Sequence, residues 1–299
     1  MFLQQVDSVD GCNIQRYQIT VRVADSLIIN PFGGSMIRGA LGHALRHLYC
    51  SCTSSKQHTV DCLYANLFEA DIGHTFVITP PKAQHLKAGG SFVFFATLLN
   101  ATKERKNAFL SSLEVAFLKG LGVKKTPCFI SDITVITPEI SIVHTSVKIT
   151  LESPWLIKYR SQPLRANELT LAHFLIAIAR RLRKLQSLGY LHISLPTNEQ
   201  LLSLAAQSRS TLKLYDVTGE RRSNRQKVKH LLSGVRGSLT VNFLDSESLR
   251  SIVPMLHYAQ WLHAGGKISF GQGALMVTPQ DKPQSQLQDL YRLAIGEAI

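Results

Sequence analysis

Four glycines and one lysine lie close together between His263 and Gly273, near the C-terminus. Glycine lets backbone amides approach a phosphodiester closely, and the ammonium group of Lys267 adds a positive charge. The spacing fits neither a Walker loop nor a dinucleotide fingerprint, so nucleoside-triphosphate binding is disfavoured. The loop is predicted to contact RNA, and a plain turn of the chain is the alternative. The predicted contacts are Gly265, Gly266, Lys267, Ser269, Gly271 and Gly273.

A second stretch, residues 221–229, holds five arginines or lysines in nine positions. Such a run is usually a solvated surface. Here uncharged hydrogen-bond donors lie between the cations, which is typical of RNA recognition through both backbone and bases. The residues of this segment predicted to bind RNA are Arg221, Arg222, Asn224, Arg225, Lys227 and Lys229.

Three of the five cysteines lie near one histidine, in the order Cys50, Cys52, His58 and Cys62. Three thiolates and an imidazole are a legitimate tetrahedral zinc set, but the Cys-x-Cys spacing is tighter than the usual gap between zinc ligands. An odd cysteine count also does not predict a disulfide framework. We therefore expect no bound metal and thiols that are buried or free. The alternative is a structural zinc ion, since four protein ligands leave no open position.

The elements that must position these residues follow from the hydrophobic periodicity. Strands are predicted at 17–23, 74–79, 92–99 and 129–136, with one helix that Ser35 would cap and another at 104–119. The same order recurs with strands at 147–151, 211–217, 238–244 and 274–278 and helices at 167–188 and 246–263, with a short inserted helix at 199–207. Strand, helix, two strands, helix and strand is the ferredoxin-like order. We predict an α+β protein with two tandem ferredoxin-like domains, residues 1–145 and 146–299.

The composition limits the partners. The chain has 299 residues and a net charge of +13, from 33 Lys and Arg against 20 Asp and Glu. Only 18% of residues are charged and 45% are hydrophobic, so a globular protein with one positive face is expected, and such a face binds phosphates. No apolar run approaches the ~20 residues that a membrane-spanning helix needs. The first residues do not follow the signal-peptide pattern, so we expect a soluble, cytoplasmic protein and no membrane partner.

Four segments together resemble the CRISPR repeat-processing endoribonucleases of the RAMP superfamily. They are the Arg-Gly-Ala-Leu-Gly-His-Ala-Leu-Arg run at 38–46, the cysteines before residues 63–69, residues 222–226 with Gly234 and Gly237, and the C-terminal glycine loop. The resemblance spans nearly the whole chain, in the order of the family. It implies two ferredoxin-like domains and metal-independent cleavage of precursor CRISPR RNA within the repeat, with no cofactor. It also implies that the product is often retained in a complex with other CRISPR subunits.

Such cleavage needs particular groups. A 2′-hydroxyl attacks the adjacent phosphorus and leaves a 2′,3′-cyclic phosphate and a 5′-hydroxyl, so a base, an acid and a cation are required. Histidine suits both proton roles. His43 and His47 are four residues apart and project from one side of the first helix. Because the family often places a catalytic histidine in this helix region, His43 is the first candidate and His47 the second.

The remaining candidate site residues are secondary. Arg38 and Arg46 could neutralise phosphate, and His263 and Lys267 are reserve catalytic candidates. Alternatively, His43 packs against the sheet as a partly buried helix residue. Two rival functions stay open: a non-catalytic RNA-binding subunit of the same superfamily, and a zinc-stabilised scaffold whose positive face binds protein or lipid.

Overall fold

A computed structural model describes residues 14–53, 57–69, 75–136, 145–222 and 229–280. Its N-terminal sheet has four antiparallel strands in the order β3-β5-β1-β6, and α1 and α2 pack on one face. The strands are β1 (Ile14–Val23), β3 (Phe76–Thr79), β5 (Ser91–Leu99) and β6 (Cys128–Ile136). The helices are α1 (Gly33–Tyr49), α2 (Lys103–Leu118) and the π-helical turn η2 (Ala65–Glu69). The short strands β2 (Leu27–Ile29) and β4 (Gln84–Leu86) pair separately.

The C-terminal sheet repeats this arrangement in the order β10-β11-β7-β12. Its strands are β7 (Ser146–Trp155), β10 (Arg209–Arg222), β11 (Lys229–Asn242) and β12 (Leu275–Pro279). The helices are α3 (Leu171–Ser187), α4 (Asn198–Gln207), α5 (Ser246–Arg250) and α6 (Val253–Leu262), with 3-10 turns η3 (Ala166–Glu168) and η4 (Ile268–Phe270). A small hairpin joins β8 (Lys158–Tyr159) to β9 (Gln162–Pro163). In each sheet the second, third, first and fourth strands are neighbours, so the predicted α+β fold with two ferredoxin-like units is confirmed.

The period-2 pattern of β1 explains how the first core forms. Tyr17, Ile19, Val21 and Val23 are buried on the helix side, whereas the residues between them are half-buried or exposed. The helix α2 begins at a true cap, because the hydroxyl of Thr102 accepts a hydrogen bond from the amide of Arg105. The alternation therefore places the buried face of β1 as predicted, and the cap sets the start of α2 at Lys103, one residue before the predicted start.

Three predicted boundaries are wrong. The helix α1 begins at Gly33, so Ser35 is inside it and does not cap it. The predicted helix over 246–263 is two helices, because Pro254 has no amide hydrogen to continue a helix from α5 into α6. The strands β10 and β11 are each 14 residues long and form one extended hairpin, whereas much shorter strands were predicted.

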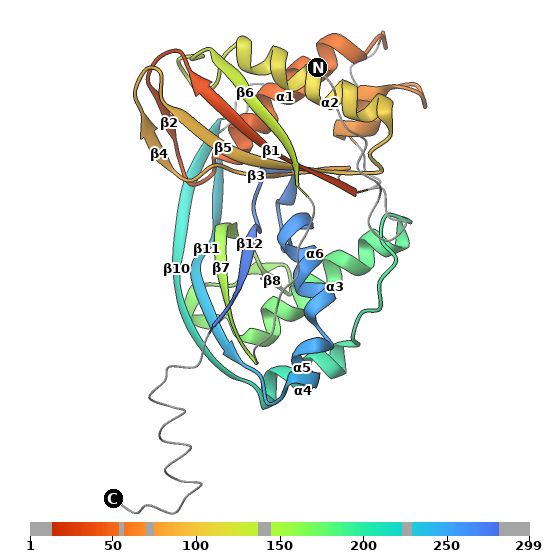
Figure 1. Cartoon of the computed structure of the whole chain (residues 1–299), viewed down its shortest axis with the longest axis vertical. Helices are drawn as coiled ribbons and strands as arrows, with labels where there is room; N and C mark the ends of the chain where they lie inside the picture. Colours follow the sequence, from red (N-terminus) through yellow and green to blue (C-terminus); the bar gives the residue numbers. More distant parts are fainter. Residues whose placement is uncertain (1–13, 54–56, 70–74, 137–144, 223–228, 281–299) are drawn as a thin grey trace, which may run out of the picture.

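The two sheets have separate cores that meet through a few specific contacts. Leu99 of β5 belongs to the C-terminal core, and the guanidinium of Arg16 donates to the carbonyl of Gln260 at 2.7 Å. The hairpin of β10 and β11 runs from the C-terminal sheet to the N-terminal one (Figure 1), where Gly219 lies against the ring of Phe32. The domain boundary between residues 145 and 146 stays a prediction; it falls between β6 and β7, which belong to different sheets.

Candidate nucleic-acid interface

The glycine-rich loop from residue 263 to 273 is wedged between the two sheets. A side chain on Gly34, at the start of α1, would lie 2.6 Å from the carbonyl oxygen of Phe270. One on Gly271 would lie 2.9 Å from the carbonyl oxygen of Ile78, at the end of β3. The loop is therefore packed directly against the start of α1 and the edge of the N-terminal sheet.

Most of the loop glycines are required by the backbone itself. Gly265, Gly271 and Gly273 have positive φ angles of 87°, 78° and 82°. The amides of Gly266, Gly271 and Gly273 donate to carbonyls of Leu156, Ile268 and Pro154 at 2.7, 2.8 and 3.0 Å. These amides already have partners within the protein, and the approach of the loop to a phosphodiester stays a prediction.

The residues of this loop that were predicted to contact RNA differ in burial. Gly271 and Gly273 are buried, so we assign them to packing and not to contact with RNA. Lys267 is exposed, and Gly265, Gly266 and Ser269 are half-buried, so these four stay predicted contacts.

The hairpin of β10 and β11 also contacts the glycine loop. The ammonium group of Lys267 donates to the carbonyl of Leu231 at 3.3 Å, and the amide of Gln272 donates to the carbonyl of Ser233 at 3.1 Å. Arg221 and Arg222 lie in β10, opposite His230 and Lys229 of β11. Asn224, Arg225 and Lys227 lie outside the described residues. The described ends of the second predicted segment therefore belong to the hairpin that the glycine loop contacts.

His263 is a buried packing residue and not a catalytic one, which corrects its place among the reserve candidates. Its side chain is fully buried, with Nδ1 3.1 Å from the carbonyl oxygen of Gln272 and Nε2 2.8 Å from Oγ1 of Thr79. The carbonyl requires a proton on Nδ1, so Nε2 accepts from the Thr79 hydroxyl. Burial, and after it the positive charges of Arg16 and Arg181, lower the pKa of His263 to about 3.

This buried neutral histidine predicts a pH-dependent stability. An unfolded histidine titrates near 6.5, whereas His263 in the folded protein titrates near 3, so the unfolded chain binds more protons in that interval. Stability from this group is complete above pH 6.5 and falls by about 1.4 kcal/mol for each pH unit below it. In urea unfolding between pH 7 and 4, the unfolding free energy of His263→Asn should depend less steeply on pH, because asparagine has no group that titrates in this range. Equal pH slopes of the unfolding free energy in the variant and the wild type would contradict this prediction.

The exposed face of α1 carries the predicted catalytic residues. His43 and His47 are exposed and Arg46 is half-buried, with its guanidinium 6.0 Å from the ring of Tyr64. Their spacing of three and four residues places them on one helix face. The alternative that His43 is partly buried against the sheet is therefore wrong. This face offers two imidazoles and one cation, which are the groups that attack by a 2′-hydroxyl requires.

The glycine loop touches a different side of the same helix. His43 follows Gly34 by nine residues, which at about 100° per residue is half a turn round the helix. An RNA strand on the His43 face would therefore lie across the outer surface of α1, and the loop would hold the helix in position without touching the reacting phosphate.

Arg38 connects this helix to the loop. Its guanidinium lies 3.9 Å from the centre of the Phe68 ring and 5.2 Å from that of Phe270, and it donates to the carbonyl of Phe68 at 3.3 Å. Cation–π contacts on two aromatic rings restrict this side chain. The structure therefore gives Arg38 a packing role beside the phosphate contact that was predicted for it.

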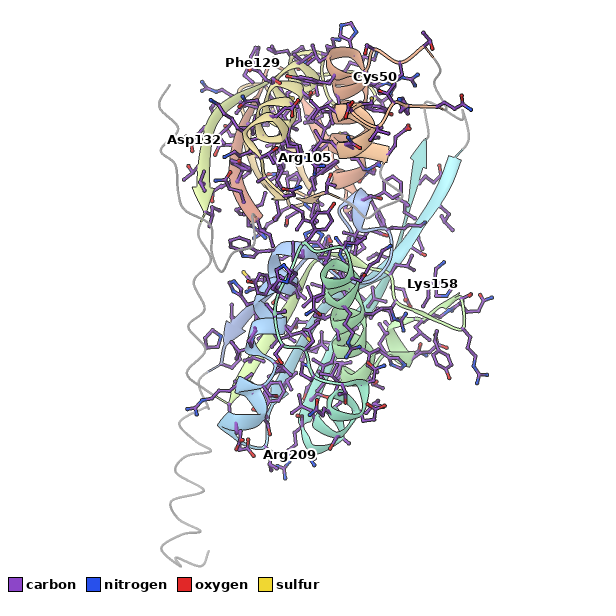
Figure 2. All side chains as sticks on the ribbon, turned by 90° about the vertical axis from the view of Figure 1, so that its right-hand side faces the viewer. Cys50, Arg105, Phe129, Asp132, Lys158 and Arg209 are labelled. Carbon is purple, nitrogen blue, oxygen red and sulfur yellow. The ribbon has the colours of Figure 1, made fainter. Side chains whose placement is uncertain are left out.

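One candidate segment was missed by the sequence analysis. The hairpin of β8 and β9 carries Lys158, Tyr159 and Arg160 at exposed positions, and Figure 2 shows Lys158 projecting from the body of the protein. Leu156, two residues earlier, pairs with Gly266, so the hairpin begins beside the glycine loop. The signal in the sequence was the Lys-Tyr-Arg run, because cations beside an aromatic ring suit both phosphates and bases.

The cysteine segment folds into a compact cluster at the end of α1. Ligand atoms of Cys50, Cys52, His58 and Cys62 all lie within 4.8 Å of one another. The amide of Thr59 and then the side chain of His58 lower the pKa of Cys52 to about 6, and burial raises the pKa of Cys62. The thiols were expected to be buried or free, with a structural zinc ion as the alternative, and the structure brings the four residues of that alternative together.

Two family models match consecutive parts of the chain. Residues 12–154 match the model AF_1859_N, an N-terminal domain, and residues 149–275 match the CRISPR-associated endoribonuclease Cas6. The C-terminal unit of this chain is thus similar to Cas6 endoribonucleases. The first match contains α1 and the second contains the glycine loop, so the candidate interface lies where the two matched regions meet.

Solved structures show the same fold at low sequence identity. A Cas6 product complex matches 89% of this chain and 99% of its own, with a TM-score of 0.56 and 14% identity. Thermus thermophilus Cas6 matches 90% of this chain and 100% of its own, with a TM-score of 0.55 and 11% identity. The product of a Cas6-related gene from Pyrococcus furiosus gives the same coverage and identity, with a TM-score of 0.54.

No curated protein sequence matches the chain. Among the helices that the structure describes, none is long and apolar enough to cross a membrane.

Proposed function

We propose that this protein binds precursor CRISPR RNA and cuts it within the repeat, without a metal ion in the reaction. A 2′-hydroxyl attacks the adjacent phosphorus and expels the 5′-oxygen, which leaves a 2′,3′-cyclic phosphate and a 5′-hydroxyl. The observation that carries the proposal is the exposed face of α1, where His43, Arg46 and His47 lie together.

Each group on this face has a role in the proposal. His43 transfers a proton to or from the reacting oxygens, and His47 supplies the second proton-transfer group. Arg46 neutralises the charge that develops on the pentacoordinate phosphorus, held in place by its contact with Tyr64. These three side chains account for the base, the acid and the cation.

Three neighbouring segments would bind the RNA backbone. They are Lys267 with the half-buried part of its loop, the basic end of the β10–β11 hairpin, and the β8–β9 hairpin with Lys158 and Arg160. Cations on separate elements that converge on one junction suit a strand of phosphates better than a single small anion.

The solved relatives are consistent with these partners. One is a Cas6 product complex, another is a RAMP protein binding different RNA substrates, and a third is part of a Cas6-RT-Cas1–Cas2 complex. We extend RNA binding, and association with further CRISPR subunits, to this chain as part of the proposal. A cytoplasmic location belongs to it as well.

The test uses the repeat RNA encoded next to the gene. Purified protein is mixed with that RNA in buffer without divalent cations, with EDTA added at the same moment, and with a matched RNA that has one 2′-deoxy nucleotide before the cut. We expect cleavage of the first RNA, no cleavage of the second, and equal affinity for both, because only the nucleophile is missing. Circular dichroism before and after EDTA identifies any loss of fold.

Two results would overturn the proposal. Tight binding of an RNA that stays intact would assign the chain to the non-catalytic RNA-binding subunits. Cleavage of the deoxy substrate at the same position would exclude the 2′-hydroxyl as nucleophile.

A further inference from the structure

The four residues of the cysteine cluster come from the end of α1 and the loop that follows it. Cys50 ends the helix in an extended conformation, and Figure 2 shows it at the outer end of the N-terminal unit. Cys62 is buried in the N-terminal core, whereas Cys50 and Cys52 are half-buried. The cluster is therefore closed on the core side and accessible to solvent on the other, as a site that is loaded after folding needs to be.

The distances in the cluster match those of a tetrahedral metal site. Nδ1 of His58 lies 3.5 Å from the sulfur of Cys50 and 3.6 Å from the sulfur of Cys62. Zinc bonds of about 2.3 Å to sulfur and 2.0 Å to nitrogen place these atoms about 3.5 Å apart in a tetrahedron, and two sulfurs about 3.8 Å apart. The widest separation in the cluster is within 4.8 Å, so a small inward movement completes the tetrahedron.

The imidazole of His58 is oriented for this role. Its Nε2 lies 3.1 Å from Oε2 of Glu69, and the hydroxyl of Tyr64 donates to the other oxygen of that carboxylate at 2.9 Å. The carboxylate favours the ring proton on Nε2 by its charge and proximity, although the two groups are not aligned as a hydrogen bond. The lone pair of Nδ1 is then left on the side of the thiols. A carboxylate behind a ligating histidine is a recurring feature of zinc sites.

Free thiols do not explain the arrangement as well. Nδ1 of a neutral imidazole has one lone pair and accepts one hydrogen bond, yet two thiols lie at 3.5 and 3.6 Å from it. The carbonyl of Tyr49, another acceptor for the Cys62 thiol, is farther away at 4.0 Å. A single metal ion binds Nδ1 and all the sulfurs at once. Three thiolates and one imidazole in a tetrahedron suit zinc better than the harder cations, which prefer oxygen ligands.

We propose that Cys50, Cys52, His58 and Cys62 bind one structural zinc ion. With four protein ligands the ion has no open position, so it holds the fold and takes no part in RNA cleavage. It joins the last turn of α1 to the loop before η2. Tyr64 stacks on Phe68 at 5.6 Å, and Phe68 fills the space beside Gly42 of α1, so the site also fixes the inner side of the helix whose outer face carries His43.

The test measures metal content directly. The full chain is purified without chelator and its zinc is quantified by inductively coupled plasma mass spectrometry. We expect about one zinc per chain in the wild type and in Cys128→Ser, since Cys128 is buried elsewhere, bonded to the carbonyl of Thr126. Cys52→Ser should lose most of the zinc, and because Cys52 is only half-buried, this variant is expected to fold.

Two further measurements separate a zinc site from a folding effect. Cobalt added to metal-free protein should give the intense visible and sulfur-to-cobalt bands of tetrahedral thiolate ligation. Glu69→Gln should keep one zinc at saturation but bind it about 10- to 100-fold more weakly, because the carboxylate only positions His58. The proposal would be overturned if folded wild-type protein bound no zinc after incubation with zinc sulfate under reducing conditions. Full zinc occupancy in Cys52→Ser would also overturn it. Neither result bears on RNA cleavage, which is measured separately.

Discussion

Replacing His43 by alanine should slow cleavage of the repeat RNA by about a hundred- to ten-thousand-fold, which is the usual contribution of one general acid or base. The side chain is exposed on α1, so its removal leaves no cavity and should change the free energy of unfolding by less than about 0.5 kcal/mol. RNA affinity should change little, since His43 acts on the reacting oxygens. The measurement is the single-turnover rate with protein in excess, beside the dissociation constant for uncleavable 2′-deoxy RNA.

Two histidine variants make this result specific. His192→Ala removes an exposed histidine of the C-terminal unit and should cleave at the wild-type rate. His47→Ala, one turn from His43 on the same face, should also slow the reaction if both imidazoles transfer protons. If His43→Ala cleaved at the wild-type rate and His47→Ala did not cleave, His47 would replace His43 as the main proton-transfer residue. Normal rates in both would remove α1 from the chemistry and leave the nuclease without the proposed groups.

The fold was predictable from the sequence where one physical signal dominates. The alternation in β1 places its buried face, and the cap at Thr102 places the start of α2. The break between α5 and α6 was not predicted, although Pro254, which cannot donate the hydrogen bond that a continuous helix needs, is a local signal for it. The full length of β10 and β11 was not predicted either, because the arginines and lysines at their ends hide the alternation of a strand.

The site was predictable in its residues but less so in their roles. The glycine loop was identified correctly as a special segment, but the contacts that require its glycines depend on the folded loop. Gly271 lies against Ile78 of β3 and Gly34 of α1, and Gly273 lies against Ala264 of the loop itself. Sequence spacing alone made zinc the less favoured reading of the cysteines. The orientation of His58 by Glu69 depends on how the loop folds back on η2, and no local pattern reveals it.

The largest loss of stability is expected for Gly273→Ala. Gly273 has a φ of 82°, and a Cβ there would lie 1.8 Å from the carbonyl oxygen of Ala264, whose own amide donates to the Gly273 carbonyl at 3.1 Å. The left-handed backbone costs alanine about 1–2 kcal/mol, and relieving the overlap costs about as much again or more. We expect destabilisation of about 3 kcal/mol or more and a melting temperature lower by about 6–12 °C.

A second glycine variant separates the cost of the left-handed backbone from the cost of the steric overlap. Gly189 has a φ of 74°, similar to that of Gly273, but an added Cβ there would meet no atom within 4 Å. Gly189→Ala should therefore lose only the backbone part, about 1–2 kcal/mol, in the same thermal and urea unfolding experiments. Since the loop holds the start of α1, Gly273→Ala should also cleave RNA more slowly at a temperature where it is folded, whereas Gly189→Ala should not. Equal stability of the two variants would show that the approach of Gly273 to Ala264 is not what the loop depends on.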